Sequence, residues 1–326
     1  VLPPLPENAP ENRLTLARWL VDPDHPLTAR VTVNRIWQQH FGTGLVRTSE
    51  DFGFQGEWPS HPELLDWLAA EFVQSGWNVK ALHRRIVLSA AFRRSSAVTP
   101  EQLLEDPDNR LLARGPRYRL DAESIRDAAL VTSGLLVETI GGPGVKPYQP
   151  EGLWEAVGYT DSNTAKFRRD DGDALHRRSL YTFWKRTSPP PSLATFDAPS
   201  REACVVRRSR TNTPLQALAL MNDVQFVEAS RHLAARILRE GGPTDADRLT
   251  YGFRLTVGRA PEADELAVLT TVLASHRADF AADPASAKQL LGVGATDRSD
   301  SLDPTEHAAF TLLASLLMNT DAFVTK

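Results

Sequence analysis

Residues 196–223, FDAPSREACVVRRSRTNTPLQALALMND, carry the helix signal that decides the fold class of this chain. Within this stretch, Thr213 is followed by Pro214 and, three residues after the threonine, by Gln216. A threonine hydroxyl at this place can accept from a backbone N–H of the first helical turn, and the glutamine can reach back to the threonine N–H. Proline fits that turn because its missing N–H would have no partner inside the helix. The spacing therefore predicts a helix that begins at Pro214.

The apolar residues of this predicted helix are expected to share one face. Leu215, Leu218 and Ala219 should point toward a core, and the polar pair Asn222 and Asp223 should end the helix. A helix with one apolar face must pack that face on another element. The stretch therefore favours a fold built from packed helices.

Further helix starts recur along the chain. A capping residue is followed three positions later by a residue that can reach back to it at Ser60 and Glu63, Thr99 and Gln102, and Asp303 and Glu306. Asn78 and Asp121 are expected to cap two more helices, the second of which is expected to end at Gly141. These signals predict a mainly α, irregular multi-helix fold.

One segment has the composition of a strand. Ser179–Lys185, SLYTFWK, is rich in aromatic residues and lies between a charged stretch and three consecutive prolines. We expect it to form, at most, the small β element of the fold.

The domain organisation follows from these elements. Residues 1–11 are Pro-rich and polar, which predicts a linker that enters from a longer polypeptide. Residues 12–326 are predicted to form a single α-rich domain, because helices without a sheet must bury their apolar faces on one another. Its expected parts are an N-terminal helical part (12–96), an irregular middle (97–210) and a C-terminal helical part (211–326).

The composition excludes several classes of protein. A chain of 326 residues that is 41% hydrophobic can bury a sizeable core. Its net charge of −4 gives no basic field for nucleic acid, so we expect no nucleic-acid partner. No run of eighteen apolar residues is present, so no membrane span is predicted.

Cysteine and histidine usage limits the possible cofactors. The single cysteine, Cys204, excludes intrachain disulfides and cysteine-rich metal sites. Covalent haem in this chain is excluded because no Cys-x-x-Cys-His is present. The eight histidines form neither His-x-x-x-His nor His-Glu-x-x-His, so we predict no metal site and no cofactor in this chain.

Three blocks of sequence carry a family resemblance. They are NRIWQQHFGTGLVRTSEDFG (34–53), PSHPELLDWLAAEF (59–72) and the stretch 196–223 quoted above. In this order they resemble the planctomycete-specific domain of unknown function 1553, which ends many cytochrome-c-containing proteins of those bacteria. The resemblance runs from about residue 12 to near the C-terminus.

The resemblance implies a setting but no reaction, because the family has no settled activity. It implies a c-type cytochrome domain and a second domain of unknown function upstream in the same polypeptide. It also implies export to the periplasm or cell surface, since covalent haem is attached outside the cytoplasm. Any haem would then belong to the upstream domain.

The first candidate ligand site is the segment before the predicted helix. Arg207, Arg208 and Arg210 precede a helix N-terminus, whose partial positive charge also attracts anions. Either an anion such as sulfate or phosphate occupies this place, or Asp197 or Glu202 neutralises the arginines. Cys204 lies in the same segment, and its thiol is either packed in the core or activated by the arginines.

The second candidate ligand site is the irregular middle. Arg177, Arg178 and Trp184 belong to a group of arginines and aromatic residues there. Aromatic rings stack on sugars and arginines hold carboxylate or sulfate groups, so an anionic or carbohydrate ligand is expected at this place.

Two hypotheses for function follow. The first is a binding or scaffold domain, without assigned chemistry, at the end of a larger exported protein. The alternative is an enzyme that acts on carbohydrate or sulfated glycan, with a site built from the middle loop and the Cys204 segment. A pocket with converging polar groups would favour the enzyme, and a broad exposed apolar or charged face would favour the scaffold.

Overall fold

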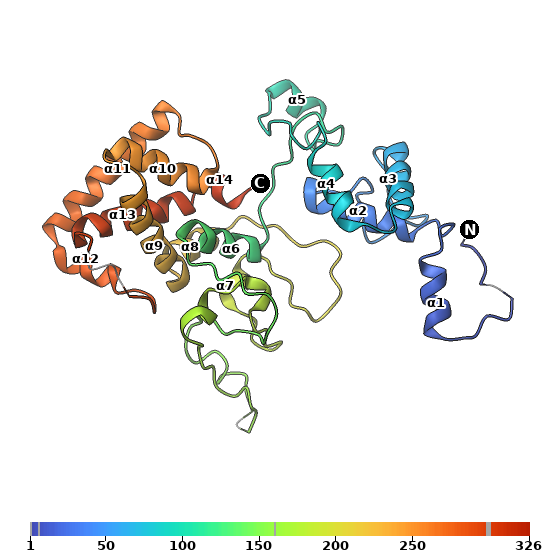
Figure 1. Ribbon diagram of the computed structural model, residues 1–326, viewed down its shortest axis with the longest axis horizontal. Helices are drawn as coiled ribbons and strands as arrows, with labels where there is room; N and C mark the ends of the chain where they lie inside the picture. The colour runs from blue at the N-terminus through green and yellow to red at the C-terminus, as the bar shows by residue number, and fades with distance from the viewer. Residues whose placement is uncertain (1, 6, 160, 298–300) are drawn as a thin grey trace. The chain divides into compact units, whose positions relative to one another are not determined.

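The protein is mainly α-helical, as predicted (Figure 1). The computed structural model describes residues 2–5, 7–159, 161–297 and 301–326. Helices, the 3₁₀-helices included, account for 50% of the chain, and within the described ranges the extended backbone forms only isolated bridges. None of the helices in these ranges is long and apolar enough to cross a bilayer.

The contacts divide the chain into two compact units, Val1–Tyr118 and Arg119–Lys326, and each is described by itself. The prediction of one domain over residues 12–326 stays a prediction. Within the predicted linker 1–11, Val1 and Pro6 lie outside the described residues, and the others form turns and irregular backbone.

The first unit is a small helical assembly with its own core. Its helices are α1 (Arg13–Leu20), α2 (Thr28–Phe41), α3 (Pro62–Gln74), α4 (Val79–Val87) and α5 (Pro100–Glu105). α2 packs on α3, and both contact α4. The core contains Trp37 and Phe41 from one face of α2, whose rings stack at 4.2 Å, together with Leu68 and Phe72 from α3.

The second unit is larger and is built around two buried helices. Its elements are α6 (Ala122–Ser133), η1 (Gly172–His176), η2 (Ser179–Tyr181), α7 (Pro191–Thr195), α8 (Pro214–Asn222), α9 (Val224–Glu240), α10 (Asp245–Val257), α11 (Ala263–Ala282), α12 (Pro284–Leu291), α13 (Pro304–Met318) and α14 (Asp321–Val324). Figure 1 shows α9 to α13 grouped together, and α9 and α13 make the most extensive contact of any helix pair. Phe226, Leu233 and Phe310 are fully buried between them.

The predicted helix starts are largely correct. Thr99 with Gln102 and Thr213 with Gln216 form capping boxes, and Asn78 and Asp303 accept from the first-turn N–H groups. The start at Ser60 is wrong: α3 has His61 at its N-cap, and the Ser60 hydroxyl lies 3.0 Å from the His61 ring instead. The second prediction to fail is the end of α6, because Gly134 adopts a left-handed conformation and stops the helix before Gly141.

The segment Ser179–Lys185 forms less β-structure than its composition suggests. Ser179–Tyr181 is the 3₁₀-helix η2, and Thr182 and Lys185 each form one isolated bridge. The backbone N–H of Ser179 donates to the Asp127 carboxylate at 2.7 Å, which removes a donor that a strand would need. The prediction of at most a small β element is therefore confirmed.

The inward face of α8 was predicted wrongly for Leu215 and Leu218, whereas Ala219 packs against the core as predicted. Leu215 and Leu218 are 60% and 53% exposed, whereas Gln216 is 1% exposed and points inward. The buried amide is satisfied, since Gln216 accepts from Arg119 at 2.5 Å and donates to the Thr195 carbonyl at 3.0 Å. A fully bonded glutamine can occupy a core position, and here it turns Leu215 and Leu218 outward while Leu220 stays buried.

Candidate functional site

A buried asparagine positions the connection between α2 and α3. Asn34 on α2 is fully buried, and it exchanges two hydrogen bonds with Val46, at 3.0 Å to the carbonyl and 2.9 Å from the N–H. Its amide also donates to the Ser49 hydroxyl at 3.1 Å. A side chain that satisfies loop backbone inside the core fixes where that loop leaves it.

The next turn of this connection is held by local hydrogen bonds. The Thr48 hydroxyl donates to the Asp51 carbonyl at 2.8 Å and accepts from the Glu57 N–H at 3.0 Å. A Cβ at Gly56 would lie 2.2 Å from the Asp51 carbonyl oxygen, so only glycine fits there. The turn therefore presents the residues that follow it in one arrangement.

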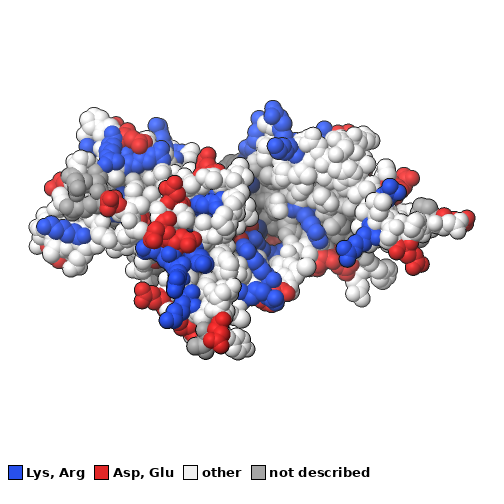
Figure 2. All heavy atoms as spheres, turned by 60° about the horizontal axis from the view of Figure 1, so that its bottom comes forward, with Lys and Arg blue, Asp and Glu red and all other residues white. Residues whose placement is uncertain are grey.

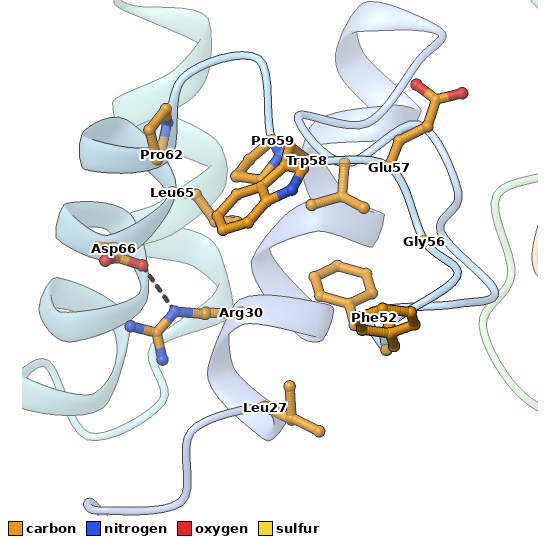
Figure 3. A pocket seen from close by; sticks show the side chains of 13 residues that line it. Leu27, Arg30, Phe52, Gly56, Glu57, Trp58, Pro59, Pro62, Leu65 and Asp66 are labelled. Carbon is orange, nitrogen blue, oxygen red and sulfur yellow. Dashed lines mark hydrogen bonds and ion pairs between the residues drawn. The ribbon is translucent and has the colours of Figure 1, made fainter. Parts of the chain in front are cut away.

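This connection and the first turns of α2 and α3 enclose a pocket of about 420 Å³. Figure 3 shows Trp58 and Pro59 on one side, Phe52 and Leu27 across from them, and a charged pair where α2 faces α3. The pocket is lined by Leu27, Arg30, Val46, Phe52, Gly53, Phe54, Gly56, Glu57, Trp58, Pro59, Pro62, Leu65 and Asp66. We call it the aromatic pocket.

Two aromatic side chains of this pocket are open to solvent. Trp58 is 88% exposed and Phe54 is fully exposed. Burying a ring of this size against a ligand would contribute about 1.5 to 3 kcal/mol, and exposed apolar groups that cluster at a pocket are typical of interaction sites. The two rings therefore make the aromatic pocket a candidate binding surface.

Polar groups lie at the edge of the same pocket. Arg30 Nε donates to Asp66 Oδ1 at 2.6 Å, and Arg30 Nη1 donates to the Pro26 carbonyl at 2.6 Å (Figure 3). Glu57 lies 3.7 Å from Arg110. Both pairs are partly exposed, so their remaining oxygens and N–H groups can reach a ligand. Apolar walls with a few fixed polar groups are typical of small-molecule sites.

The second unit contains a buried network around Glu228. This fully buried carboxylate accepts from Tyr148 Oη at 2.9 Å, from the Ala295 and Thr296 N–H groups at 2.9 Å each and from the Thr296 hydroxyl at 2.7 Å. His176 Nε2 lies 3.0 Å from Glu228 Oε2. The network closes a connection between η1, α9 and the segment after α12.

The environment of Glu228 keeps it ionised. Burial alone would raise the pKa of Glu228, but hydrogen bonds from His176, Thr296 and Tyr148 outweigh burial and hold that pKa well below its usual range. Burial, and secondly the charge of Arg231, lower the pKa of His232 to about 4. His232 Nε2 lies 2.7 Å from the Thr296 hydroxyl, so it belongs to the same network as a neutral ring.

A second cavity of about 570 Å³ lies beside this network. Its lining includes the aromatic residues Tyr148 and Phe167 and the carboxylates Glu151 and Asp223. Burial raises the pKa of Asp223, although its hydrogen bond from the Gln225 N–H acts the other way. The buried amide nitrogen of Gln149, another lining residue, has no hydrogen-bond partner within the described part of the chain.

The predicted site before α8 is partly neutralised within the molecule. Arg208 forms a two-pronged ion pair with Glu123, at 2.6 and 3.3 Å, and lies 3.7 Å from Asp121. Arg207 and Arg210 are exposed, and both take part in interactions. Arg208 is therefore paired with Glu123 on α6. It is not paired with Asp197 or Glu202, the carboxylates nearer to it in sequence, since these bond to Thr211 and Arg186. Cys204 is a free, exposed thiol, so it is not packed in the core.

Asp197 is occupied locally. Its carboxylate accepts from the Thr211 N–H at 2.7 Å and from the Thr211 hydroxyl at 2.9 and 3.0 Å. These hydrogen bonds fix the segment before α8, and Arg208 pairs with Glu123 instead of Asp197.

The three residues predicted as a ligand site in the irregular middle each make separate contacts within the protein. Arg177 is buried, donates to the carbonyls of Thr139, Gly141 and Pro143, and covers the Tyr181 ring at 3.8 Å. Arg178 pairs with Asp127 at 3.5 Å. Trp184 Nε1 donates to the Ser200 carbonyl at 3.0 Å, and Arg201 lies over its ring. Figure 2 shows that acidic side chains lie next to basic ones on the visible face of the protein.

Sequence reasoning missed both the aromatic pocket and the Glu228 network. The signal for the pocket was present: residues 51–60, DFGFQGEWPS, contain three aromatic residues and two glycines without helical spacing. The Glu228 network joins residues 148, 176, 228 and 296, and no spacing reveals such a meeting. Among the described residues, no group of three or more His, Cys, Asp or Glu is arranged to hold a metal ion.

Comparison with known proteins gives one match. Neither the curated proteins nor the solved structures contain a match to this chain. The family described as "Protein of unknown function (DUF1553)", PSD1, matches residues 12–273, which is most of the chain. The chain therefore belongs to the DUF1553 (PSD1) family of proteins of unknown function.

Proposed function

We propose that the chain is a carbohydrate-binding module, and that a neutral sugar ring lies against Trp58 in the aromatic pocket. The observation that carries this proposal is the 88% exposure of the Trp58 side chain at the edge of a pocket of about 420 Å³. A sugar ring has an apolar face that stacks on an indole and hydroxyl groups that need donors and acceptors.

The polar groups of the pocket match the hydroxyl groups of a sugar. Asp66 Oδ1 is occupied by Arg30, which leaves its second oxygen to accept from a ligand hydroxyl. Arg30 keeps N–H groups that can donate to the same ligand, since a guanidinium has five. Neighbouring hydroxyl groups on a sugar ring could therefore be bound together at the wall between α2 and α3.

The charge of the lining favours a neutral sugar over a sulfated one. Glu57 and Asp66 line the pocket with Arg30, so its carboxylates outnumber its cations. A sulfate group there would face like charge, which disfavours binding. The ligand proposed for the aromatic pocket is therefore a neutral carbohydrate and not a sulfated glycan.

Titration calorimetry with neutral gluco-, xylo- and manno-oligosaccharides, and with sulfated ones, tests the proposal. We expect weak binding of a neutral oligosaccharide and about a tenfold loss in the Trp58→Ala variant, because an aromatic contact contributes about 1 kcal/mol or more. Trp67→Ala is the matched control, since Trp67 is 50% exposed in the same unit and does not line the pocket. Equal losses in both variants, or binding of sulfated ligands alone, would contradict the proposal.

We place this module in a larger exported protein. The resemblance supports an upstream cytochrome c domain, a second upstream domain and an extracytoplasmic location, and the missing Cys-x-x-Cys-His motif supports the proposal that this chain holds no haem. Cell fractionation and haem staining of the full polypeptide and of residues 1–326 test these points. We expect the full polypeptide outside the cytoplasm and stained, and the shorter chain unstained; staining of the shorter chain would contradict the assignment.

A second candidate function is hydrolysis of a carbohydrate at the cavity beside the Glu228 network. Glu151 and Asp223 share this cavity with Tyr148 and Phe167, and a carboxylate pair beside aromatic rings is the arrangement of many glycosidases. Asp223, partly buried with a raised pKa, would protonate the leaving oxygen, and Glu151 would activate water or attack the sugar.

Release of nitrophenol from aryl glycosides tests this second function. We expect Glu151→Gln and Asp223→Asn each to lose turnover, and asparagine keeps the cap that Asp223 provides to α9. Turnover that survives in both variants would exclude this pair as the catalytic groups.

A further inference from the structure

α8 presents an apolar face to solvent. Leu215, Leu218 and Met221 are 60%, 53% and 52% exposed, and they recur every three residues on one side of the helix. We call these three residues the α8 stripe. Contiguous exposed apolar side chains of this kind mark an interaction surface more often than a free one.

The segment that carries the stripe has no charge. Residues 211–222, TNTPLQALALMN, contain no Lys, Arg, Asp, Glu or His. Like charges that oppose contact between two copies are therefore missing along α8 itself. A partner with a charged face would find nothing to pair with on this helix, whereas an identical uncharged helix matches it.

The stripe is arranged symmetrically about the middle of the helix. Leu218 is the central residue of Pro214–Asn222, with Leu215 three positions before it and Met221 three positions after it. If two such helices lie antiparallel, Leu218 meets its own copy and Leu215 meets Met221 of the other chain. Antiparallel helices also place the positive end of one dipole beside the negative end of the other. These are the properties of a twofold interface, in which one patch pairs with itself.

We propose that the α8 stripe is a self-association surface, at which α8 pairs antiparallel with α8 of a second copy about an axis at Leu218. The contact is small, since nine residues of helix span about 13 Å. A stable interface buries about 800 Å² per partner, which is more than the face of one short helix supplies. We therefore expect a reversible dimer with a dissociation constant on the order of 10 µM.

Sedimentation equilibrium of the full chain over a range of concentrations tests the association. We expect a monomer–dimer equilibrium that shifts at least tenfold toward monomer in Leu218→Asp. Leu104→Asp is the matched control, because Leu104 on α5 is 85% exposed in the other unit. Circular dichroism melts check that both variants keep the fold. A wild-type chain that stays monomeric, or equal shifts in the two variants, would overturn the proposal.

Disulfide trapping tests the orientation of the two helices. Because Cys204 is the single cysteine, a Cys204→Ser background carries no other thiol. A disulfide needs Cα atoms within about 7 Å, which only a residue at the twofold axis satisfies with its own copy. We expect Leu218→Cys in this background to form a linked dimer much faster than Leu104→Cys. Linking of the two variants at the same rate would mean random collision and would reject the antiparallel arrangement.

Discussion

The aromatic pocket and the Glu228 network use polar and aromatic side chains in opposite ways. At Glu228 four hydrogen bonds and the contact with His176 saturate a fully buried carboxylate, and the Tyr148 hydroxyl is committed to it. In the aromatic pocket Trp58 and Phe54 are open to solvent, and Arg30 and Asp66 keep unused hydrogen-bonding groups. Saturated groups hold chain segments together, whereas unsaturated ones are available to a ligand. The comparison predicts that changes at Glu228 alter stability and that changes at Trp58 alter binding.

The largest effect is expected for Glu228→Ala. Removing the carboxylate leaves four partly buried donors and the buried His176 ring without their acceptor, which should lower the free energy of unfolding by about 3 to 5 kcal/mol. Urea denaturation followed by circular dichroism measures this loss. Glu240→Gln is the control on the same helix, where an exposed pair with Arg236 should change stability by less than about 1 kcal/mol. Equal effects of the two variants would show that the network does not stabilise the fold.

The next effect concerns acid pH. His232 has a folded pKa of about 4, below its ordinary value near 6.5, so its contribution is present above pH 6.5 and is lost as pH falls from about 6.5 to 4. The Glu228 contribution is present above about pH 4.3 and is lost below it, because its folded pKa is lowered. We expect His232→Gln to lose about 2 kcal/mol less stability than the wild type between about pH 6.5 and 4. This value is smaller than the full linkage value because the ring is partly exposed.

Thermal melts of the wild type and His232→Gln between pH 7.5 and 3.5 measure the two phases. His276 also contributes to the first phase, because burial lowers its pKa as well. The melting temperatures of His232→Gln are therefore compared with those of the wild type at each pH. A first phase that is unchanged in His232→Gln would assign it to other groups.

A smaller effect is expected at the start of α8. Thr213→Ala removes the capping box with Gln216 and should lower the free energy of unfolding by about 1 kcal/mol. Chemical denaturation measures it, with Thr211→Ser as a control that keeps a hydroxyl for Asp197. A loss above about 3 kcal/mol would mean that the turn before α8 unfolds as well.

The smallest effect on stability is expected at the aromatic pocket. Trp58→Ala should change the free energy of unfolding by no more than about 0.5 kcal/mol, because the side chain is almost fully exposed. Trp37→Ala, in the core of the same unit, should cost about 3 to 5 kcal/mol. A large loss of stability in Trp58→Ala would place Trp58 with the structural residues and remove the basis for the proposed binding site.

Local rules predicted most helices and failed where distant residues meet. Caps at Thr99, Asn78 and Thr213 depend on neighbours within one turn, and the structure confirms them. The orientation of α8 depends on the distant Arg119, which satisfies the Gln216 amide inside the core. Periodicity alone could not anticipate that a glutamine would displace two leucines from the buried face.

The candidate sites show the same limit. Arg208 was expected to meet an anion or a carboxylate near it in sequence, but its partner is Glu123, which lies 85 residues away. The aromatic pocket depends on Asn34, which reaches across 12 residues to Val46. Sequence indicates which side chains are unusual, while hydrogen bonds between distant segments decide which of them meet.

The clamp made by Arg177 has a consequence for how this loop can vary. The Arg177 guanidinium donates to the carbonyl oxygens of residues 139, 141 and 143, so a single side chain fixes the spacing of these three residues. An inserted or deleted residue there would move at least one carbonyl out of reach, although the segment itself is exposed. We therefore expect the length of this loop and the arginine to change together among related chains, as one inherited unit.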